Sequence, residues 1–118
     1  MIRLKRIYEP ADPEDGFRIL VERLWPRGVS KEKAALNLWL KEVAPSTDLR
    51  TWFAHDPDKW NEFQRLYREE LQSNNAIADL TNICKTQNVT FIYAASDTQH
   101  NAAIALKEYV EHCLKNLH

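Results

Sequence analysis

The amino-acid sequence predicts an α/β fold, a single domain in which a small parallel or mixed sheet of about three to four strands is covered by helices. Short apolar or alternating segments, typical of strands, are separated by longer segments whose apolar residues recur at helical spacing. Strands that are separated by helices connect through right-handed crossovers, which favours parallel neighbours. The length of 118 residues, with no internal repeat or linker, fits one domain over residues 1–118.

Three segments are typical of strands. Residues 2–8 alternate apolar and charged side chains, as in a half-buried strand, and the Pro- and Gly-containing residues 9–16 form a loop. Residues 17–24 and 89–95 are more continuously apolar. We expect these last two strands to be neighbours, because each is apolar enough for a central position and each precedes a helix.

The remaining segments predict helices. Ser30 is a suitable N-cap, and Pro45 ends the helix that follows it near Ala44. The apolar residues of this helix recur at i, i+3, i+4 and i+7 and form one stripe: Leu36, Trp39, Leu40 and Val43. Further segments share such a pattern: a short turn at 46–53, and helices at about 56–73, 77–84 and 98–117.

Composition and charge limit the classes of protein. Hydrophobic residues make up 44% and charged residues 28%, and the net charge of −1 gives no overall attraction to nucleic acid or to an anionic membrane. No segment has the ~20 apolar residues of a membrane span, and no signal-peptide pattern opens the sequence. Cys84 and Cys113 are interpreted as small buried hydrophobes. We therefore expect a cytoplasmic protein, whose oligomeric state the sequence does not reveal.

Ligands of open α/β sheets collect at the carboxyl ends of the strands. The first such corner is Arg-x-Trp-Pro-Arg-Gly, in which Arg23 and Arg27 offer guanidinium forks for phosphate or carboxylate oxygens. Gly28 permits a positive φ, Lys31 adds a charge, and Trp25 can stack on a ligand ring. The alternative is that the arginines pair with acidic neighbours and Trp25 closes the core.

The second corner follows the strand at 89–95. His100 and Asp97 are candidates for acid/base catalysis, because a histidine exchanges protons near neutral pH. Asp97 can instead cap the final helix, and His100 can be a hydrogen-bonded structural residue. Tyr93 and Asn101 are candidates for ligand binding, and Tyr93 can instead pack against Trp25.

No pattern predicts a metal or a cofactor. His55 and Asp56 are adjacent but lack a third ligand in local register. Nucleophilic motifs, such as a serine elbow or a Cys-His pair, are also absent from the sequence. We therefore predict neither a metal site nor a cofactor.

Four segments together resemble the YeaO-like proteins, a branch of a bacterial domain-of-unknown-function family: "RILVERLWPRGVSKEKAAL", "WLKEVAPSTDLRTWFAHDP", "WNEFQRLYREEL" and "YAASDTQHNAAIALKEY". The resemblance extends over about residues 3–109 and implies a compact α/β domain without an established activity. Its motifs fall on residues 23–28 followed by Lys31, on residues 44–46 followed by Arg50, Trp52 and His55, and on residues 93–101.

Two departures from the family pattern concern mechanism. Ala102 stands where the family often has a second histidine. Tyr93 and Asn101 stand where more distant branches have "CAE…CHR". The resemblance therefore argues against a two-histidine or a thiol mechanism. Some relatives carry a label of transcriptional regulator, but this sequence shows no helix-turn-helix with a basic recognition helix.

The leading hypothesis is a protein that binds a small anionic ligand, phosphate- or nucleotide-like, where the two corners meet, with acid/base catalysis as a further option. The sequence argues against nucleic acid or a membrane as its partner. The alternative hypothesis is a non-catalytic interaction module, regulatory or nucleic-acid-associated, that uses the Trp-rich middle segment. A pocket joining the two corners favours the first hypothesis. An exposed apolar patch around Trp39, Trp52 and Trp60 favours the second.

Overall fold

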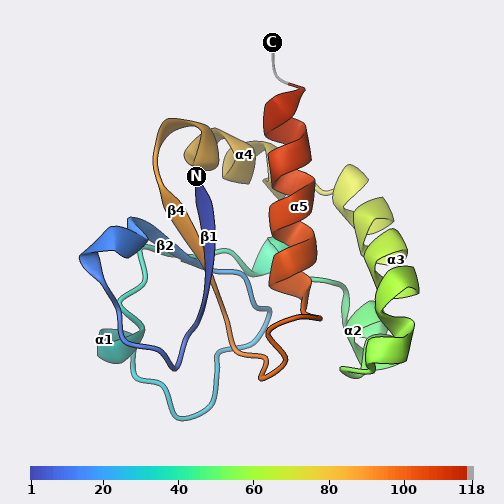
Figure 1. Ribbon diagram of the computed structural model, residues 1–118, viewed down its shortest axis with the longest axis horizontal. Helices are drawn as coiled ribbons and strands as arrows, with labels where there is room; N and C mark the ends of the chain where they lie inside the picture. The colour runs from blue at the N-terminus through green and yellow to red at the C-terminus, as the bar shows by residue number, and fades with distance from the viewer. Residues whose placement is uncertain (117–118) are drawn as a thin grey trace.

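Four parallel strands form a sheet at the centre of the molecule, in the order β1-β4-β2-β3 (Figure 1). The computed structural model describes residues 1–116. The strands are β1 (Ile2–Arg6), β2 (Phe17–Leu20), β3 (Leu38–Trp39) and β4 (Val89–Tyr93). β4 pairs with β1 on one side and with β2 on the other. The prediction that the second and last strands are neighbours is therefore confirmed, and the sheet is entirely parallel.

β4 is the central strand because its side chains suit burial on both faces. All five of its residues, Val-Thr-Phe-Ile-Tyr, are buried. The polar member of this run, Thr90, donates its hydroxyl hydrogen bond to the Asp15 carbonyl oxygen at 2.7 Å. β-Branched and aromatic residues without alternation are typical of a parallel strand that is covered on both sides.

Helices cover one face of the sheet (Figure 1). They are α2 (Thr47–Phe53), α3 (Trp60–Gln72), α4 (Ala76–Thr86) and α5 (Ala102–Lys115). α5 lies against β1 and β4, and α3 and α4 pack beside it. α3 contributes Phe63, Tyr67 and Leu71, which are spaced at i, i+4 and i+8 and point into the main core.

The other face is covered by connections rather than by long helices. Leu20 and Ile92 point to this face, since they alternate with residues of the main core, and they pack with Ile7 and Ala34 in a smaller core. Ala34 lies in the short helix α1 (Lys31–Ala34). The segments on either side of β2 complete the layer.

A buried ion cluster, made by Lys5, Asp15 and Arg18, fixes these connections to the sheet. The Asp15 carboxylate contacts Arg18 Nη1 at 2.6 Å and Lys5 Nζ at 2.9 Å. The Arg18 guanidinium also donates to the carbonyl oxygens of Ala34 and Ala35. Hydrogen bonds to both partners satisfy the charges that burial would otherwise penalise.

The helix predicted from Ser30 to Ala44 was wrong. α1 has four residues and ends at Ala34, and the following residue, Ala35, adopts a left-handed conformation with φ of 47°. Sheet hydrogen bonds then take over: the Asn37 amide donates to the Arg18 carbonyl, and the Leu40 amide donates to the Leu20 carbonyl, both at 2.9 Å. This pairing with β2 outweighs the helical spacing of the apolar residues, and a 3-10 turn at Lys41–Val43 follows β3.

The other predicted elements are confirmed with shifted ends. The strands are shorter than predicted, and the final helix begins at Ala102 with Asn101 as its N-cap. Asp97 therefore does not cap that helix, and His100 precedes the helix instead of lying in its first turn. Leu117, assigned to the apolar face of the same helix, lies outside the described residues.

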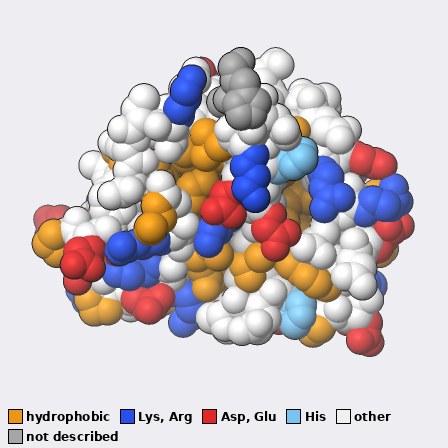
Figure 2. Space-filling model, turned by 45° about the horizontal axis from the view of Figure 1, so that its top comes forward, with side chains coloured by type: hydrophobic (Ala, Val, Ile, Leu, Met, Phe, Trp, Pro, Cys, Tyr) orange, Lys and Arg blue, Asp and Glu red, His pale blue; other side chains and the backbone are white. Residues whose placement is uncertain are grey.

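Lys and Arg side chains lie next to Asp and Glu side chains on the face shown in Figure 2, in keeping with the net charge of −1. Over residues 1–116, each helix is too short or too polar to cross a membrane.

Candidate functional site

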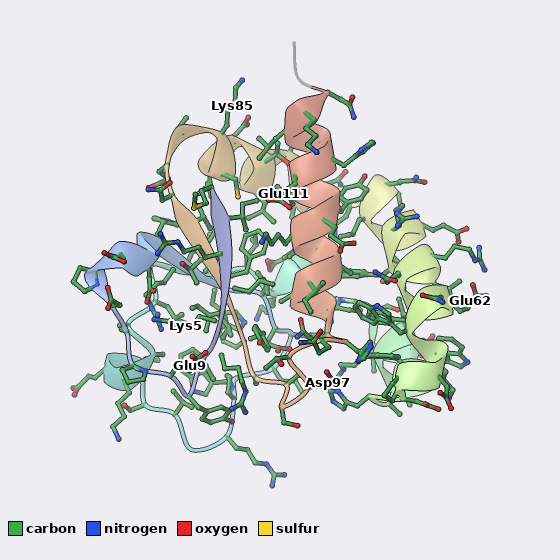
Figure 3. All side chains as sticks on the ribbon, in the orientation of Figure 1. Lys5, Glu9, Glu62, Lys85, Asp97 and Glu111 are labelled. Carbon is green, nitrogen blue, oxygen red and sulfur yellow. The ribbon has the colours of Figure 1, made fainter. Side chains whose placement is uncertain are left out.

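The carboxyl ends of the parallel strands meet at one edge of the sheet, where α5 begins. Figure 3 shows Asp97 at this edge, in the connection that leads from β4 into α5. Between the ends of β2 and β4 lies a cavity of about 60 Å³, which we call the carboxyl-edge pocket. Its polar lining residues are Glu22, Arg23, Arg50, His55, Tyr93 and Asn101. Phe53 and Phe63 are among its apolar lining residues.

Arg23 reaches the pocket from the segment after β2. Its guanidinium donates to the Pro45 carbonyl at 3.2 Å and to the Ala44 carbonyl at 3.1 Å. These two bonds fix the orientation of the guanidinium without neutralising its charge, because carbonyl oxygens carry no net charge. Arg23 is thus a positioned cation in the wall of the pocket, one of the two arginines that the sequence singled out.

Two more basic side chains, Arg50 and His55, come from α2 and the residue pair that ends it. Arg50 lies within α2, and Ala54 and His55 follow with φ of 46° and 58°. Two consecutive non-glycine residues in the left-handed region are uncommon and require support from their surroundings. This turn brings His55 back to the lining of the pocket.

Glu22 is the acidic residue of the pocket. Its Oε1 accepts a hydrogen bond from the Ala94 amide at 2.9 Å, which links the ends of β2 and β4. Burial raises the pKa of Glu22, although the Ala94 hydrogen bond and the charges of Arg50 and His55 partly oppose this effect. A half-buried carboxyl group therefore lies among basic side chains at this edge of the sheet.

Tyr93 and Asn101 form the side of the pocket next to α5. Tyr93 ends β4, and burial raises the pKa of its phenol. Asn101 is 3% exposed, and its Oδ1 accepts the Ile104 amide at 3.0 Å while its Nδ2 donates to the Asp97 carbonyl at 2.9 Å. Asn101 thus caps α5 and ties the preceding turn to the helix.

Asp97 and His100 form a pair just outside the pocket. Asp97 Oδ2 lies 3.1 Å from His100 Nδ1, and Oδ1 accepts the amides of Gln99 and His100. The Gln99 amide is the main reason why the pKa of Asp97 is lowered. The His100 ring packs edge-on against Trp60, with ring centroids 5.5 Å apart. This geometry orients the imidazole, but neither side chain lines the cavity.

The rest of the first corner points elsewhere. Trp25 packs against the smaller core and against Trp39, and its Nε1 donates to the Val29 carbonyl at 2.7 Å. Arg27 and Lys31 are exposed. Gly28 has φ of 73° and lines a separate hollow of about 490 Å³. The structure therefore brings Arg23, Tyr93 and Asn101 together in one pocket, and it does not bring Trp25, Arg27, Gly28 or Lys31 to that pocket.

Sequence reasoning assigned no ligand-binding role to three residues of the pocket. Glu22 was detectable as an acid that directly follows the apolar residues 19–21 of a predicted strand. Arg50 and His55 appeared in a family motif, but the position of His55 depends on the left-handed turn after α2, for which the sequence has no glycine signal. Among residues 1–116, no group of three His, Cys, Asp or Glu side chains is arranged to hold a metal ion.

The sequence of this chain is similar to a protein family and to several bacterial proteins. Residues 1–118 match a family described as the "Inactive DUF488-N3 subclade". The uncharacterised protein YeaO of Escherichia coli is 42% identical over 110 residues, which cover 92% of this chain and 96% of YeaO. Uncharacterised proteins of Mycobacterium tuberculosis and Mycobacterium bovis are each 38% identical over 107 residues, 91% of either chain. No solved structure matches this chain. The resemblance to the YeaO-like proteins is thereby confirmed, and the chain belongs to the inactive N3 subclade of the DUF488 family.

Proposed function

We propose that this protein binds a small anion, or the anionic end of a larger ligand, in the carboxyl-edge pocket. The observation that carries the proposal is the convergence of Arg23, Arg50 and His55 on one cavity. Against these basic groups stands one acid, Glu22. The balance of charge in the pocket is therefore positive, although the whole chain has a net charge of −1.

The size of the pocket limits what it encloses. Its volume of about 60 Å³ is well below the roughly 300–1,000 Å³ of pockets that enclose drug-sized ligands. A single phosphate or carboxylate group suits this space better than a whole nucleotide. The remainder of a nucleotide-like ligand would lie outside, near the exposed side chain of Arg50.

Binding without chemistry agrees best with the family. Its description calls the subclade inactive, and the Asp97–His100 pair lies outside the pocket wall. Acid/base catalysis by this pair would need a ligand that extends from the pocket past Asn101 toward the His100 ring. We therefore propose a binding role first, with catalysis as the further option.

The alternative role, as an interaction module, is favoured by two exposed tryptophans. Trp39 is 37% exposed and Trp52 is 40% exposed. Each has a lysine ammonium over its ring, Lys41 at 5.0 Å and Lys59 at 5.2 Å. Trp60, in contrast, packs against the main core. If this role is correct, replacing both exposed tryptophans with alanine abolishes binding to a partner or nucleic acid while anion binding is unchanged.

The test of the anion site compares two exposed arginines. Calorimetric titration with inorganic phosphate should show binding to the wild-type protein. Arg50→Ala should weaken that binding about ten- to a hundredfold, because it removes a charged hydrogen-bonding partner. Arg27→Ala, which removes an exposed arginine outside the pocket, should leave the affinity unchanged. A loss in Arg27→Ala but not in Arg50→Ala would place the site at the Arg-x-Trp-Pro-Arg-Gly corner, and no binding to wild type would contradict the proposal.

A further inference from the structure

The Glu22 carboxylate would repel any anion that binds in the carboxyl-edge pocket. This carboxyl group lines the same small cavity as Arg23, Arg50 and His55. Two negative groups that share a site of low dielectric repel each other, and only one of them ionises readily. A proton held between the two groups turns this repulsion into a hydrogen bond. The chemistry of the pocket thus requires one proton at the position where the ligand meets Glu22.

We propose that the carboxyl-edge pocket selects oxyanions that share a proton with Glu22, so that it takes phosphate-like ligands in preference to sulfate-like ones. This inference rests on the proposed function. Inorganic phosphate keeps one proton throughout the neutral pH range, as the hydrogen phosphate ion, so it can donate its own O–H to the Glu22 carboxylate. Sulfate has no such proton near neutral pH and binds only after Glu22 has taken one from water.

The geometry of Glu22 suits this role. Oε1 is engaged by the Ala94 amide, which holds the carboxyl group in place. Within residues 1–116, no side chain or amide donates a hydrogen bond to Oε2, and this atom is not sealed from solvent. The second oxygen is therefore free to accept a hydrogen bond from a protonated ligand, or to donate one when it is itself protonated.

The ionisable groups around Glu22 come from four parts of the structure. Arg23 follows β2 on the same strand end, and Arg50 and His55 belong to α2 and its terminal turn. Tyr93 ends β4. From α3, Tyr67 is close enough that Glu22 contributes to raising its pKa, and the Tyr67 hydroxyl donates to the Val43 carbonyl.

The basic groups favour the ionised form of Glu22, and burial favours the neutral form. Burial prevails, since the pKa of Glu22 is raised. A bound anion adds a negative charge and excludes water, and both changes raise the pKa of Glu22 further. Binding of a fully ionised anion is therefore coupled to the uptake of one proton, whereas binding of a protonated phosphate is not.

The experiment titrates phosphate and sulfate into the wild-type protein at pH 6 and pH 8. The phosphate affinity is expressed per concentration of the hydrogen phosphate ion, so the ionisation of phosphate in solution does not enter the ratio of the two affinities. We expect phosphate to bind more tightly than sulfate. The ratio should increase by up to about a hundredfold from pH 6 to pH 8, since one coupled proton corresponds to about tenfold per pH unit. At pH 8, where phosphate is mainly the hydrogen phosphate ion, titrations in buffers of different ionisation enthalpy should show proton uptake with sulfate alone.

Variants separate the role of Glu22 from general damage. In Glu22→Gln the neutral amide donates to either anion, so the two affinities should converge and lose their different pH dependence. Glu42→Gln, an exposed acid outside the pocket, should retain the wild-type ratio. Thermal melts check that each variant folds, and the wild-type pH series needs no variant. Equal affinities for phosphate and sulfate at both pH values would overturn the selectivity while leaving anion binding intact. Absence of binding by either anion would instead overturn the proposed function, and this inference with it.

Discussion

Asp15→Asn removes the negative charge at the centre of the buried ion cluster and leaves two cations facing a neutral amide. Asp15 and Arg18 each retain only 5% of their side-chain exposure, and their charged atoms lie 2.6 Å apart. Breaking such a buried pair typically costs about 3–5 kcal/mol. We expect the lower end, about 3 kcal/mol, because Lys5 keeps some contact with water and a second acceptor at the Pro10 carbonyl. For a domain of this size, the loss corresponds to a decrease in Tm of roughly 10 °C.

The same substitution has a defined pH dependence. Burial alone would raise the pKa of Asp15, but hydrogen bonds from Lys5, the Asp12 amide and Arg18 outweigh burial and lower it. The folded-state pKa thus lies below the unfolded value of about 3.9. The contribution of Asp15 to stability is complete above that value and is lost as the pH falls through the folded pKa. The stability difference between wild type and Asp15→Asn should therefore shrink in acid below about pH 4.

Urea denaturation at pH 7 and at lower pH measures both effects. Glu62→Gln is the matched control, since Glu62 contacts Arg65 at the same 2.6 Å but on the exposed surface of α3. Water and salt screen this exposed pair, so its loss should change the midpoint far less. The reasoning would be refuted if both variants lost the same small amount of stability, or if the Asp15→Asn difference grew in acid.

Two further predictions concern glycine and tryptophan positions. Gly16→Ala should cost more than about 2 kcal/mol, because Gly16 has φ of 64° and an added Cβ would lie 2.6 Å from the Asn88 carbonyl oxygen. Gly28 has φ of 73°, but no atom lies within 4 Å of an added Cβ, so Gly28→Ala should cost only the backbone strain of about 1 kcal/mol. Equal decreases in Tm for the Gly16 and Gly28 variants in thermal melts would exclude the steric argument. Trp60→Ala should cost about 3 kcal/mol of stability, because the Trp60 ring packs against the main core. Trp52→Ala should cost much less, because Trp52 is exposed. Chemical denaturation measures both losses, and the reverse order would contradict this packing.

How much of the fold was predictable depends on whether local or distant contacts decide an element. The composition of β4 and its polar flanks identified a central strand, because burial on both faces selects a continuous apolar run. The stretch from Leu36 to Val43 has helical spacing, yet it forms β3 and a 3-10 turn. Its conformation is decided by hydrogen bonds to Arg18 and Leu20, about twenty residues earlier in the chain, which a local pattern does not contain.

The candidate site shows the same limit. Tyr93 and Asn101 were predicted to bind a ligand because they lie at the end of β4 and before the start of α5. Arg23 was predicted for the same site because it follows the neighbouring strand, β2. Trp25 does not line the pocket, because it donates a hydrogen bond to the Val29 carbonyl and packs against the smaller core. The spacing of residues in the sequence reveals neither contact. Arg50 reaches the pocket from α2, which packs against α3, and such a tertiary contact is not visible in a local pattern.

The position of β4 between β1 and β2 has a consequence for the synthesis of this protein. Ile2 pairs with Val89, and Phe17 pairs with the same residue. Until the last quarter of the chain has been made, β1 therefore has no partner and β2 pairs only with the short strand β3. Contacts of such long sequence separation slow folding, because loop closure must precede the pairing that rewards it. A nascent chain that ends before β4 would leave β1 unpaired and one edge of β2 open. This interval is when the protein is most open to aggregation or to binding by a chaperone.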